Sequence, residues 1–394
     1  MIVKTFSVFL LSIYILLSIF LSACGLIPNP AERVYLPSGA LREVSSRDQS
    51  VKFLEYRYQS KLSRIDGIVP VDIFNHGIND LVVVGAADSA VEVLRNLGDG
   101  TFQYFSKKSI CVAGNDIDTG DFNGDGFSDL IVNCTHDSKI QIFYGNGRGD
   151  FNLQEIVVSP AVIGISTPAN YGSPGTNQFS LLKDKPSELD ILFRNPSGEF
   201  DQKKSLPLSP APSRLVSDVF TRDGAVSYVI ASEVNSIFSV FINHGGDYEK
   251  NDYSTIQSPS DFDTVDFRNN GYKDLILTSA NIGNFRIYEN DGNGKFPQFR
   301  EYSIPHGTAS IVGITHLKAE RKPELTLQSN QTGDLFIYSN LGGNSFLEPQ
   351  SVSLGGTFMG ATTGAFVSKQ GDLDLALIDS QKNEVVILLN EKQM

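Results

Sequence analysis

The chain has 394 residues, with 32 Lys and Arg against 45 Asp and Glu, and a formal charge of −13. Nucleic acid and anionic lipid surfaces attract clustered Lys and Arg, so this acidic balance argues against both as partners. Apolar residues make up 41% of the chain, including 26 Phe and 14 Tyr, which is enough for an extensive buried core.

The first residues are expected to form a leader rather than part of the fold. Lys4 precedes an apolar run at residues 6–21, and the sequence LSAC ends at Cys24. A basic start, an apolar stretch and small residues before a cleavage point are typical of an export signal. The run also approaches the length of a membrane span, so an uncleaved anchor is the alternative. We predict a signal peptide at residues 1–23.

The LSAC sequence resembles the lipobox of bacterial lipoproteins. This resemblance implies that the peptide is removed and that Cys24 becomes an acylated N-terminus, a palmitate-type lipid anchor in the membrane. Gly25 follows the Cys, unlike the Asp of inner-membrane retention signals, which implies a bacterial cell envelope location at the outer membrane or cell surface. Residues 24–49 contain three Pro and no hydrophobic period, which predicts a flexible tether.

Aromatic residues recur every 48–50 residues through the rest of the chain. They are Phe53, Phe102, Phe151, Phe200, Tyr248, Phe296 and Phe346. Self-similarity at a period of 40–50 residues is typical of propellers, in which each repeat is one four-stranded blade. The seven positions therefore predict seven blades.

The second repeat shows the expected strands most clearly. Alternation at residues 115–122 predicts an inner strand, residues 130–133 and 140–144 predict the next two, and residues 153–158 predict the outer strand. Gly, Asn and Asp separate these runs, as expected for an antiparallel meander.

The two ends of the repeat region complement each other. The last repeat ends at Asn390 before its fourth strand, while Phe53 lies one period ahead of Phe102 without strands of its own. We therefore predict that residues 50–58 supply the missing strand, so that the ring has no open edge. The expected fold is all-β: a seven-bladed β-propeller of four-stranded antiparallel blades at residues 50–392, closed by an N-terminal strand.

Three segments carry a resemblance to a known family. The sequences INDLVVV at 78–84, DFNGDGFSDL at 121–130 and NNGYKDLIL at 269–277 resemble FG-GAP or VCBS repeats, as do the glycine-rich turns before Phe102 and Phe296. Such repeats build seven-bladed propellers like the head of the integrin α subunit, so the resemblance implies the same ring and a protein-binding role. The likeness is strong in repeats one, two and five and faint in the others.

The loop of repeat two has oxygen-bearing side chains at alternate positions. Positions 1, 3, 5 and 9 of this nine-residue loop are Asp121, Asn123, Asp125 and Asp129. The carbonyl of Phe127, at position 7, would add a fifth ligand. Calcium takes six to eight oxygens, and three carboxylates without a cation would repel one another, so we predict one Ca²⁺ here. The alternative is an Asp- and Gly-rich turn held by side-chain hydrogen bonds.

The corresponding loops of repeats one and five are poorer candidates. Repeat five keeps Asp266 and Asp274, but Arg268 takes position 3, and its guanidinium could replace a cation by pairing with the carboxylates. This disfavours a second Ca²⁺ near Asp266 and Asp274. Repeat one has Asp72 and Asp80 with a Phe and a His between them, which also disfavours a metal.

Two cysteines remain once Cys24 is assigned to lipid. Cys111 and Cys134 are expected at one end of the same blade, and exported proteins meet an oxidising space, so a disulfide is one interpretation. Cysteines also occur as small buried hydrophobic residues. The sequence leaves both interpretations open.

No sequence motif favours catalysis. The five His occupy loop positions, and no HExxH, CxxC or glycine-rich phosphate loop occurs. The sequence favours a membrane-anchored adhesion, binding or scaffold module whose partner is an envelope or extracellular protein. A lectin that binds a glycan is the alternative, followed by a polysaccharide lyase or hydrolase. The expected contact surface comprises the loops at 87–90, 135–139 and 280–284, on the face opposite the calcium loop.

Overall fold

The computed structural model describes residues 42–46, 51–112, 114, 116–158, 162–168, 178–232, 234–279, 281–305, 307–315, 322–367 and 374–390. The chain divides into two units, Met1–Ala40 and Leu41–Met394, and every described residue belongs to the second. The predicted signal peptide and Cys24 lie outside the described residues. Within the described ranges, all regular elements longer than a turn are strands, and no helix meets the length and apolarity of a membrane span.

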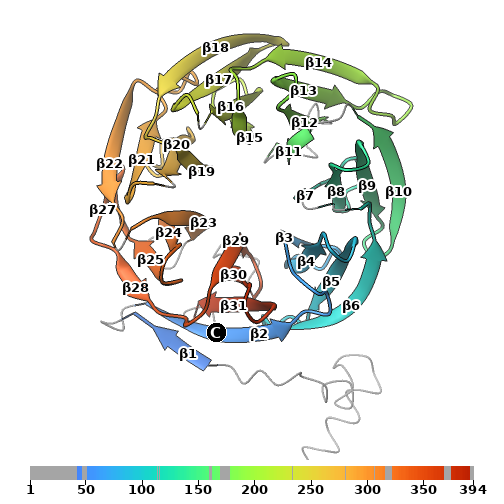
Figure 1. The fold of residues 1–394 in the computed structure, drawn as a ribbon, viewed down its shortest axis with the longest axis vertical. Coiled ribbons are helices and arrows are strands. Elements are labelled where there is room, and N and C mark those ends of the chain that lie inside the picture. Colours follow the sequence, from blue (N-terminus) through green and yellow to red (C-terminus); the bar gives the residue numbers. More distant parts are fainter. Residues whose placement is uncertain are drawn as a thin grey trace, which may run out of the picture. The chain divides into compact units, whose positions relative to one another are not determined.

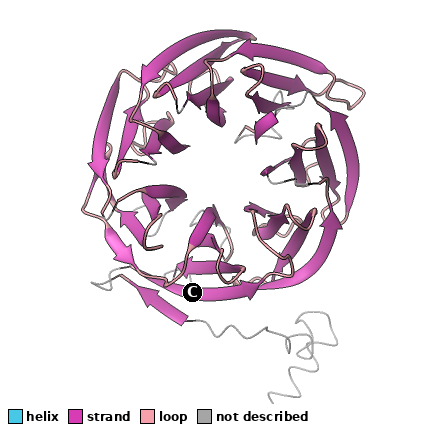
Figure 2. Cartoon of the chain, viewed as in Figure 1, coloured by secondary structure: helices cyan, strands magenta, loops and turns pink. Residues whose placement is uncertain are grey.

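The second unit is a ring of seven antiparallel sheets that stand as blades around a central axis (Figures 1 and 2). Each blade begins with an inner strand near the axis and proceeds outward to the rim. The predicted all-β, seven-bladed propeller is therefore confirmed.

The blades follow one another in chain order. From the axis outward, blades one to three consist of β3 (Gly67–Val71), β4 (Asp80–Gly85), β5 (Ala90–Asn96), β6 (Phe102–Ser109); β7 (Asp116–Gly120), β8 (Asp129–Cys134), β9 (Lys139–Gly145), β10 (Phe151–Val157); and β11 (Val162–Ser166), β12 (Gln178–Lys183), β13 (Glu188–Phe193), β14 (Gln202–Pro207). Blades four to six consist of β15 (Pro212–Val219), β16 (Val226–Ser232), β17 (Ile237–His244), β18 (Asp247–Ser254); β19 (Pro259–Val265), β20 (Asp274–Ser279), β21 (Asn284–Glu289), β22 (Gln298–Ser303); and β23 (Ala309–Thr315), β24 (Glu324–Ser329), β25 (Leu335–Tyr338), β28 (Gln350–Val352). In blade six, a hairpin of β26 (Asn340–Gly342) and β27 (Ser345–Phe346) precedes the short outer strand.

The seventh blade joins the two ends of the ring. It contains β29 (Phe358–Gly364), β30 (Asp374–Asp379) and β31 (Glu384–Asn390) from the end of the chain and β2 (Lys52–Gln59) from its beginning. β2 runs antiparallel to β31, with Phe53 opposite Asn390. The predicted closure by residues 50–58 is confirmed, because this pairing supplies the strand that the last repeat lacks.

A fifth strand, β1 (Arg42–Ser45), extends the seventh blade beyond the predicted fold. It pairs with the outer side of β2, and Ser46 forms a bridge to Val352 in blade six. Val44 is buried among apolar residues of the last two blades. Within the segment predicted as a tether, residues 24–49, the four residues Arg42–Ser45 therefore belong to the sheet. A four-residue strand with one buried apolar side chain is too short to give a periodic signal.

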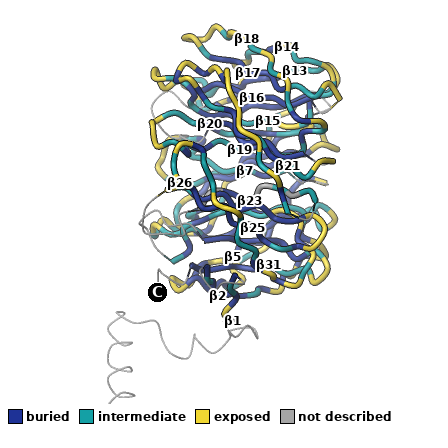
Figure 3. The backbone as a smooth tube through the Cα atoms, turned by 90° about the vertical axis from the view of Figure 1, so that its left-hand side faces the viewer, coloured by how far each residue is buried: buried dark blue, intermediate teal, exposed yellow. Residues whose placement is uncertain are grey.

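Apolar side chains fill the spaces between neighbouring blades. Val82 and Val84 on β4, for example, pack with Leu130 and Val132 on β8. The second strands are covered on both faces and have almost no exposed residue, which explains their continuous apolar runs (Figure 3). The repeating aromatic residue lies at or near the start of the outer strand, as Phe102 does in β6.

Side chains of the closing strand reinforce its backbone pairing. The Arg57 guanidinium lies 2.5 Å from Glu55 Oε1, 3.0 Å from Asp379 Oδ2 and 3.0 Å from Glu384 Oε2. Asp379 is fully buried, and the carboxylates come from both ends of the chain. These three hydrogen-bonded carboxylates raise the pKa of Arg57 against the opposing effect of burial. The group thus links β2 to the C-terminal strands.

A second buried carboxylate ties the closing strand to blade one. Glu92, on β5, is fully buried and accepts hydrogen bonds from the Tyr58 hydroxyl at 2.5 Å and the Ser60 hydroxyl at 2.7 Å. The Tyr56 hydroxyl donates to the Phe102 carbonyl at 2.9 Å. The closing strand is therefore bonded to blades on both sides of the seam.

We expect Arg57→Met to lower the free energy of unfolding by about 3 kcal/mol, because it leaves the buried Asp379 carboxylate without its arginine. Denaturant unfolding measures this loss. Lys107→Met is the matched control: it removes an exposed pair with Asp88 and should cost less than about 1 kcal/mol. Equal losses for the two variants would show that the Arg57 group does not hold the seam.

Candidate functional site

The loops between the first and second strands of blades one, two and five share one backbone frame. At position 4 and again at position 6 of each loop the backbone has positive φ, and position 6 is always Gly. The carboxylate at position 1 accepts backbone N–H groups from positions 5 and 6. These carboxylates are Asp72, Asp121 and Asp266, with N···O distances of 2.7–3.1 Å.

A buried carboxylate at position 9 anchors each of these loops to the next turn of its blade. One of its oxygens accepts the backbone N–H of the residue sixteen positions later, at 2.7–2.9 Å. The three pairs are Asp80 with Asn96, Asp129 with Gly145, and Asp274 with Asn290. Blade seven repeats the bond with Asp374 and Asn390. Position 9 is thus a structural element that does not require a metal.

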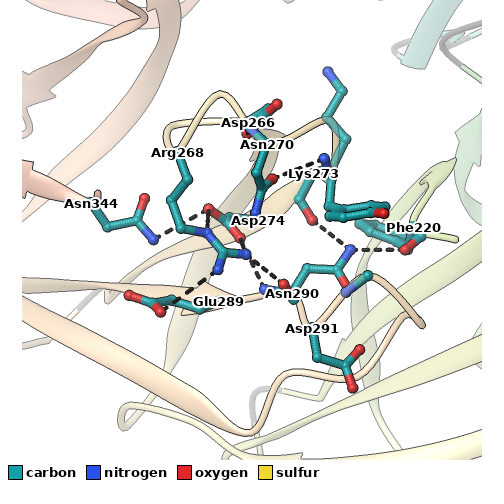
Figure 4. Close-up of polar contacts among 12 residues, drawn as sticks. Phe220, Asp266, Arg268, Asn270, Lys273, Asp274, Glu289, Asn290, Asp291 and Asn344 are labelled. Atoms are coloured by element: carbon teal, nitrogen blue, oxygen red, sulfur yellow. Dashed lines mark hydrogen bonds and ion pairs between the residues drawn. The ribbon is translucent and has the colours of Figure 1, made fainter. Parts of the chain in front are cut away.

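Blade five supplies a cation from its own chain (Figure 4). Arg268, at position 3, places Nη2 2.7 Å from Asp274 Oδ1 and Nε 3.1 Å from Asp274 Oδ2. Nη1 lies 3.9 Å from Glu289, and the Asn344 amide also donates to Asp274. Burial raises the pKa of Asp274, and Arg268 opposes that shift. The guanidinium pairs with the position-9 carboxylate in the manner that the sequence suggested.

Blade one places an imidazole between its two carboxylates. His76, at position 5, has Nδ1 3.2 Å from Asp72 Oδ1 and Nε2 3.5 Å from Asp80 Oδ1. Asp80 is fully buried, which raises its pKa, whereas the other two side chains are 24–28% exposed. Across the described part of the chain, this is the one group of three His, Cys, Asp or Glu side chains whose ligand atoms all lie within 4.8 Å. Sequence reasoning discounted this loop.

Blade two has carboxylates but no internal cation. In the described part of the chain, Asp121, Asp125 and Asp129 form no ion pair of the kind seen with Arg268 or His76. Burial raises the pKa of Asp129 to about 7, and the charges of Asp125 and Asp121 add to the shift. A bound cation would offset the charges of Asp121 and Asp125 and lower the pKa of Asp129. Of the three loops, this one would therefore be stabilised most by a cation.

Hydrogen bonds within the blade-two loop hold the predicted ligands in a tight turn. The Asn123 amide nitrogen donates to Asp125 Oδ2 at 2.8 Å, and the Phe127 N–H donates to Asp125 Oδ1 at 2.9 Å. The side-chain hydrogen bonds of the alternative interpretation are therefore present. They leave further carboxylate lone pairs available, so the two interpretations are compatible.

Carboxylates near the axis join neighbouring blades. Asp118, on β7, accepts bonds from the N–H and hydroxyl of Thr167, at 2.9 and 2.7 Å, beyond the end of β11. Asp218, on β15, accepts the hydroxyl of Thr264 on β19. Asp116 accepts a backbone N–H of β11, and burial raises its pKa to about 6. Asp116, Asp118 and Asp218 thus link the inner strands of neighbouring blades.

Two cysteines lie at the opposite end of blade two from its Asp-rich loop. The Sγ atoms of Cys111, in the connection from β6, and Cys134, at the end of β8, are bonded at 1.98 Å. The Cys111 N–H donates to Gln141, and the Val112 N–H donates to Asp137 in the adjoining turn. The connection between blades one and two is therefore fastened to the β8–β9 turn.

The predicted contact loops follow the second strands of their blades. Antiparallel order places the β4–β5, β8–β9 and β20–β21 turns at the ends of the blades opposite the Asp-rich loops, although residue 280 lies outside the described ranges. Exposed apolar side chains occur at both ends of the ring. Val234 and Ile282 lie on the contact side, and Leu97 and Leu341 lie on the other. Apolar exposure alone does not choose between the two faces.

Comparisons with known proteins agree with this architecture. Residues 72–132, from the blade-one loop through most of β8, match the family of FG-GAP-like repeats. No curated protein matches the chain by sequence.

Similar folds occur among solved structures. Crystals of BBS1N in complex with ARL6DN, soaked with lead or with mercury, contain a chain that is 13% identical with a TM-score of 0.62, over 87% of this chain and 98% of that chain. A functionally unknown protein from Desulfotomaculum acetoxidans DSM 771 is 12% identical with a TM-score of 0.55, over 74% of this chain and 86% of that chain. These likenesses support the fold, which the strand order shows to be a seven-bladed β-propeller, and residues 72–132 are similar to FG-GAP-like repeats.

Proposed function

We propose that this protein is an exported, membrane-anchored lipoprotein whose propeller is a protein-binding or scaffold module. The observation that carries the binding role is the use of the inner-strand polar groups: Asp118 and Asp218 bond to neighbouring blades. With those groups engaged, we expect the turns at the two ends of the ring to contact the partner. The similar structure of BBS1N, which crystallises in complex with ARL6DN, supports a protein as the partner.

We further propose that the blade-two loop binds Ca²⁺ through Asp121, Asn123, Asp125, Asp129 and the Phe127 carbonyl. The support is the contrast between loops of one frame: Arg268 neutralises the blade-five loop, whereas the blade-two loop has uncompensated carboxylates. All-oxygen donors suit calcium, whose role would be to stabilise the loop. Because Arg268 already pairs with Asp274, we do not expect a second Ca²⁺ near Asp266 and Asp274.

Calcium removal should destabilise the protein. At Ca²⁺ concentrations about 100-fold above Kd, the ion should add about 3 kcal/mol to the free energy of unfolding. Asp125→Asn should abolish that increment, and in EDTA this variant should be at least as stable as the wild type, because one repelling charge is gone. Denaturant unfolding with and without Ca²⁺ measures both effects.

Asp266→Asn is the control for the calcium experiment, because it changes the same frame in the loop that Arg268 neutralises. It should lose some stability but keep the full calcium increment. The proposed site would be ruled out if Ca²⁺ does not change the free energy of unfolding of the wild type. It would also be ruled out if Ca²⁺ stabilises Asp125→Asn as much as the wild type.

The lipid anchor makes a separate prediction. Cys24→Ser should abolish labelling by a radioactive fatty acid, because the acyl chains have no attachment point. The measurement is radiolabelling of cells followed by immunoprecipitation. Ser22→Ala keeps the Cys and should remain labelled. Absence of label from the wild type as well would favour the uncleaved anchor.

The contact face can be tested by photo-crosslinking in the native envelope. A photoreactive residue in place of Val234, which is 78% exposed on the β16–β17 turn, should form a discrete protein adduct. The matched position is Leu341, which is 55% exposed at the other end of the ring and should not.

Adducts from Leu341 alone would contradict this prediction, because they would place the contact on the face that carries the Asp-rich loops. If neither position gives an adduct and the purified propeller binds to a glycan array, the results would instead support the lectin interpretation.

A further inference from the structure

We propose that the blade-one loop holds a divalent first-row transition metal of the Zn²⁺ class through Asp72, His76 and Asp80. The ligand atoms of these side chains, one per residue, all lie within 4.8 Å of one another. The site differs from the blade-two loop in its donor set, and the inference does not depend on calcium binding there.

The ligand atoms lie near the spacing of a metal shell. His76 Nδ1 lies 3.2 Å from Asp72 Oδ1, and Nε2 lies 3.5 Å from Asp80 Oδ1. In a tetrahedral shell with bonds of about 2.1 Å, neighbouring ligand atoms are about 3.4 Å apart. Each nitrogen faces a different carboxylate, so one ion would bind a single nitrogen, and the three side chains would shift to meet it from within 4.8 Å of one another. Water would complete the shell.

The imidazole itself lacks the partners that a buried polar ring normally has. Both ring nitrogens of His76 are shielded from solvent and form no hydrogen bond, although carboxylate oxygens lie within 3.5 Å. Buried polar atoms without a partner are rare and costly, and an unseen ion is one recognised reason for them. Arg268 in the matching blade-five loop, by contrast, donates two hydrogen bonds to its carboxylate.

The carboxylates are already oriented by the backbone. Asp72 accepts the N–H groups of His76 and Gly77, and Asp80 accepts those of Ile73 and Asn96. Such supporting bonds fix the direction of metal ligands and reduce the ordering required when an ion binds. Asp72 and His76 are partly exposed, so the proposed site lies next to solvent, whereas Asp80 is buried.

The donor set selects the metal class. Zn²⁺, Co²⁺ and similar ions accept imidazole nitrogen together with carboxylate oxygen, whereas Ca²⁺ requires six to eight oxygens. Position 3, which bears an amide in blade two, is Phe74 here, and its ring packs edge-on against Phe105 with centroids 4.8 Å apart. The blade-one loop therefore has too few oxygens for calcium.

Calorimetric titration of tag-free protein with Zn²⁺, in buffer that already contains Ca²⁺, tests the site. We expect one Zn²⁺ per chain and at least tenfold weaker binding in His76→Gln. His136→Gln, which changes an exposed histidine in the β8–β9 turn, should bind like the wild type. Asp125→Asn should also be unaffected. With Co²⁺ as the probe, the wild type but not His76→Gln should gain a visible absorption band.

Failure of the wild type to bind Zn²⁺ would overturn the proposal, as would equal affinities for the wild type and His76→Gln. Circular dichroism verifies that each variant is folded. If His76→Gln does not fold, Asp72→Asn provides the same comparison, because it removes a carboxylate charge while retaining an acceptor oxygen for the loop.

Discussion

The pairing of β2 with β31 is the constraint on which the ring depends. Each other blade is completed by strands that lie close together in the sequence, but the seventh needs β2, which lies more than 300 residues before β31. Backbone pairing alone would close the ring. Arg57 and Glu92 add buried charged and polar contacts that link the closing strand to blades seven and one. A shift in register would break these contacts and leave buried charges without partners. Closure and register are therefore secured together.

Within that ring, one loop frame accommodates three solutions to the same electrostatic problem. Burying a carboxylate at position 9 fastens the loop to its blade, but it also places negative charge in a desolvated site. Blade five answers with Arg268, blade one places His76 between two carboxylates, and blade two has only acidic neighbours around Asp129. Because the backbone bonds are the same in all three, the differences lie in the side chains at positions 3 and 5.

The periodic aromatic residues and the abrupt end at Asn390 were enough to predict the number of blades and the closing strand, because both reflect a regular repeat. β1 was missed because one buried side chain in four residues carries no period. The Arg268 pair was predictable from its spacing within one loop. The approach of His76 to Asp72 and Asp80 was not, since the residue types suggested an incomplete shell and only the folded turn brings their atoms together. The Cys111–Cys134 pairing likewise depends on how a connection meets a turn.

Acidic residues in this protein must be assigned by their partners rather than by their frequency. Asp118 and Asp218 each bond to a threonine of the next blade and so hold adjacent inner strands together. Asp80, Asp129 and Asp274 fasten loops in the same way. The two proposed cation sites use loops of the same frame, in blades one and two, and each includes one of these buried carboxylates. In the function proposed above, the turns that these blades hold in place would contact the partner.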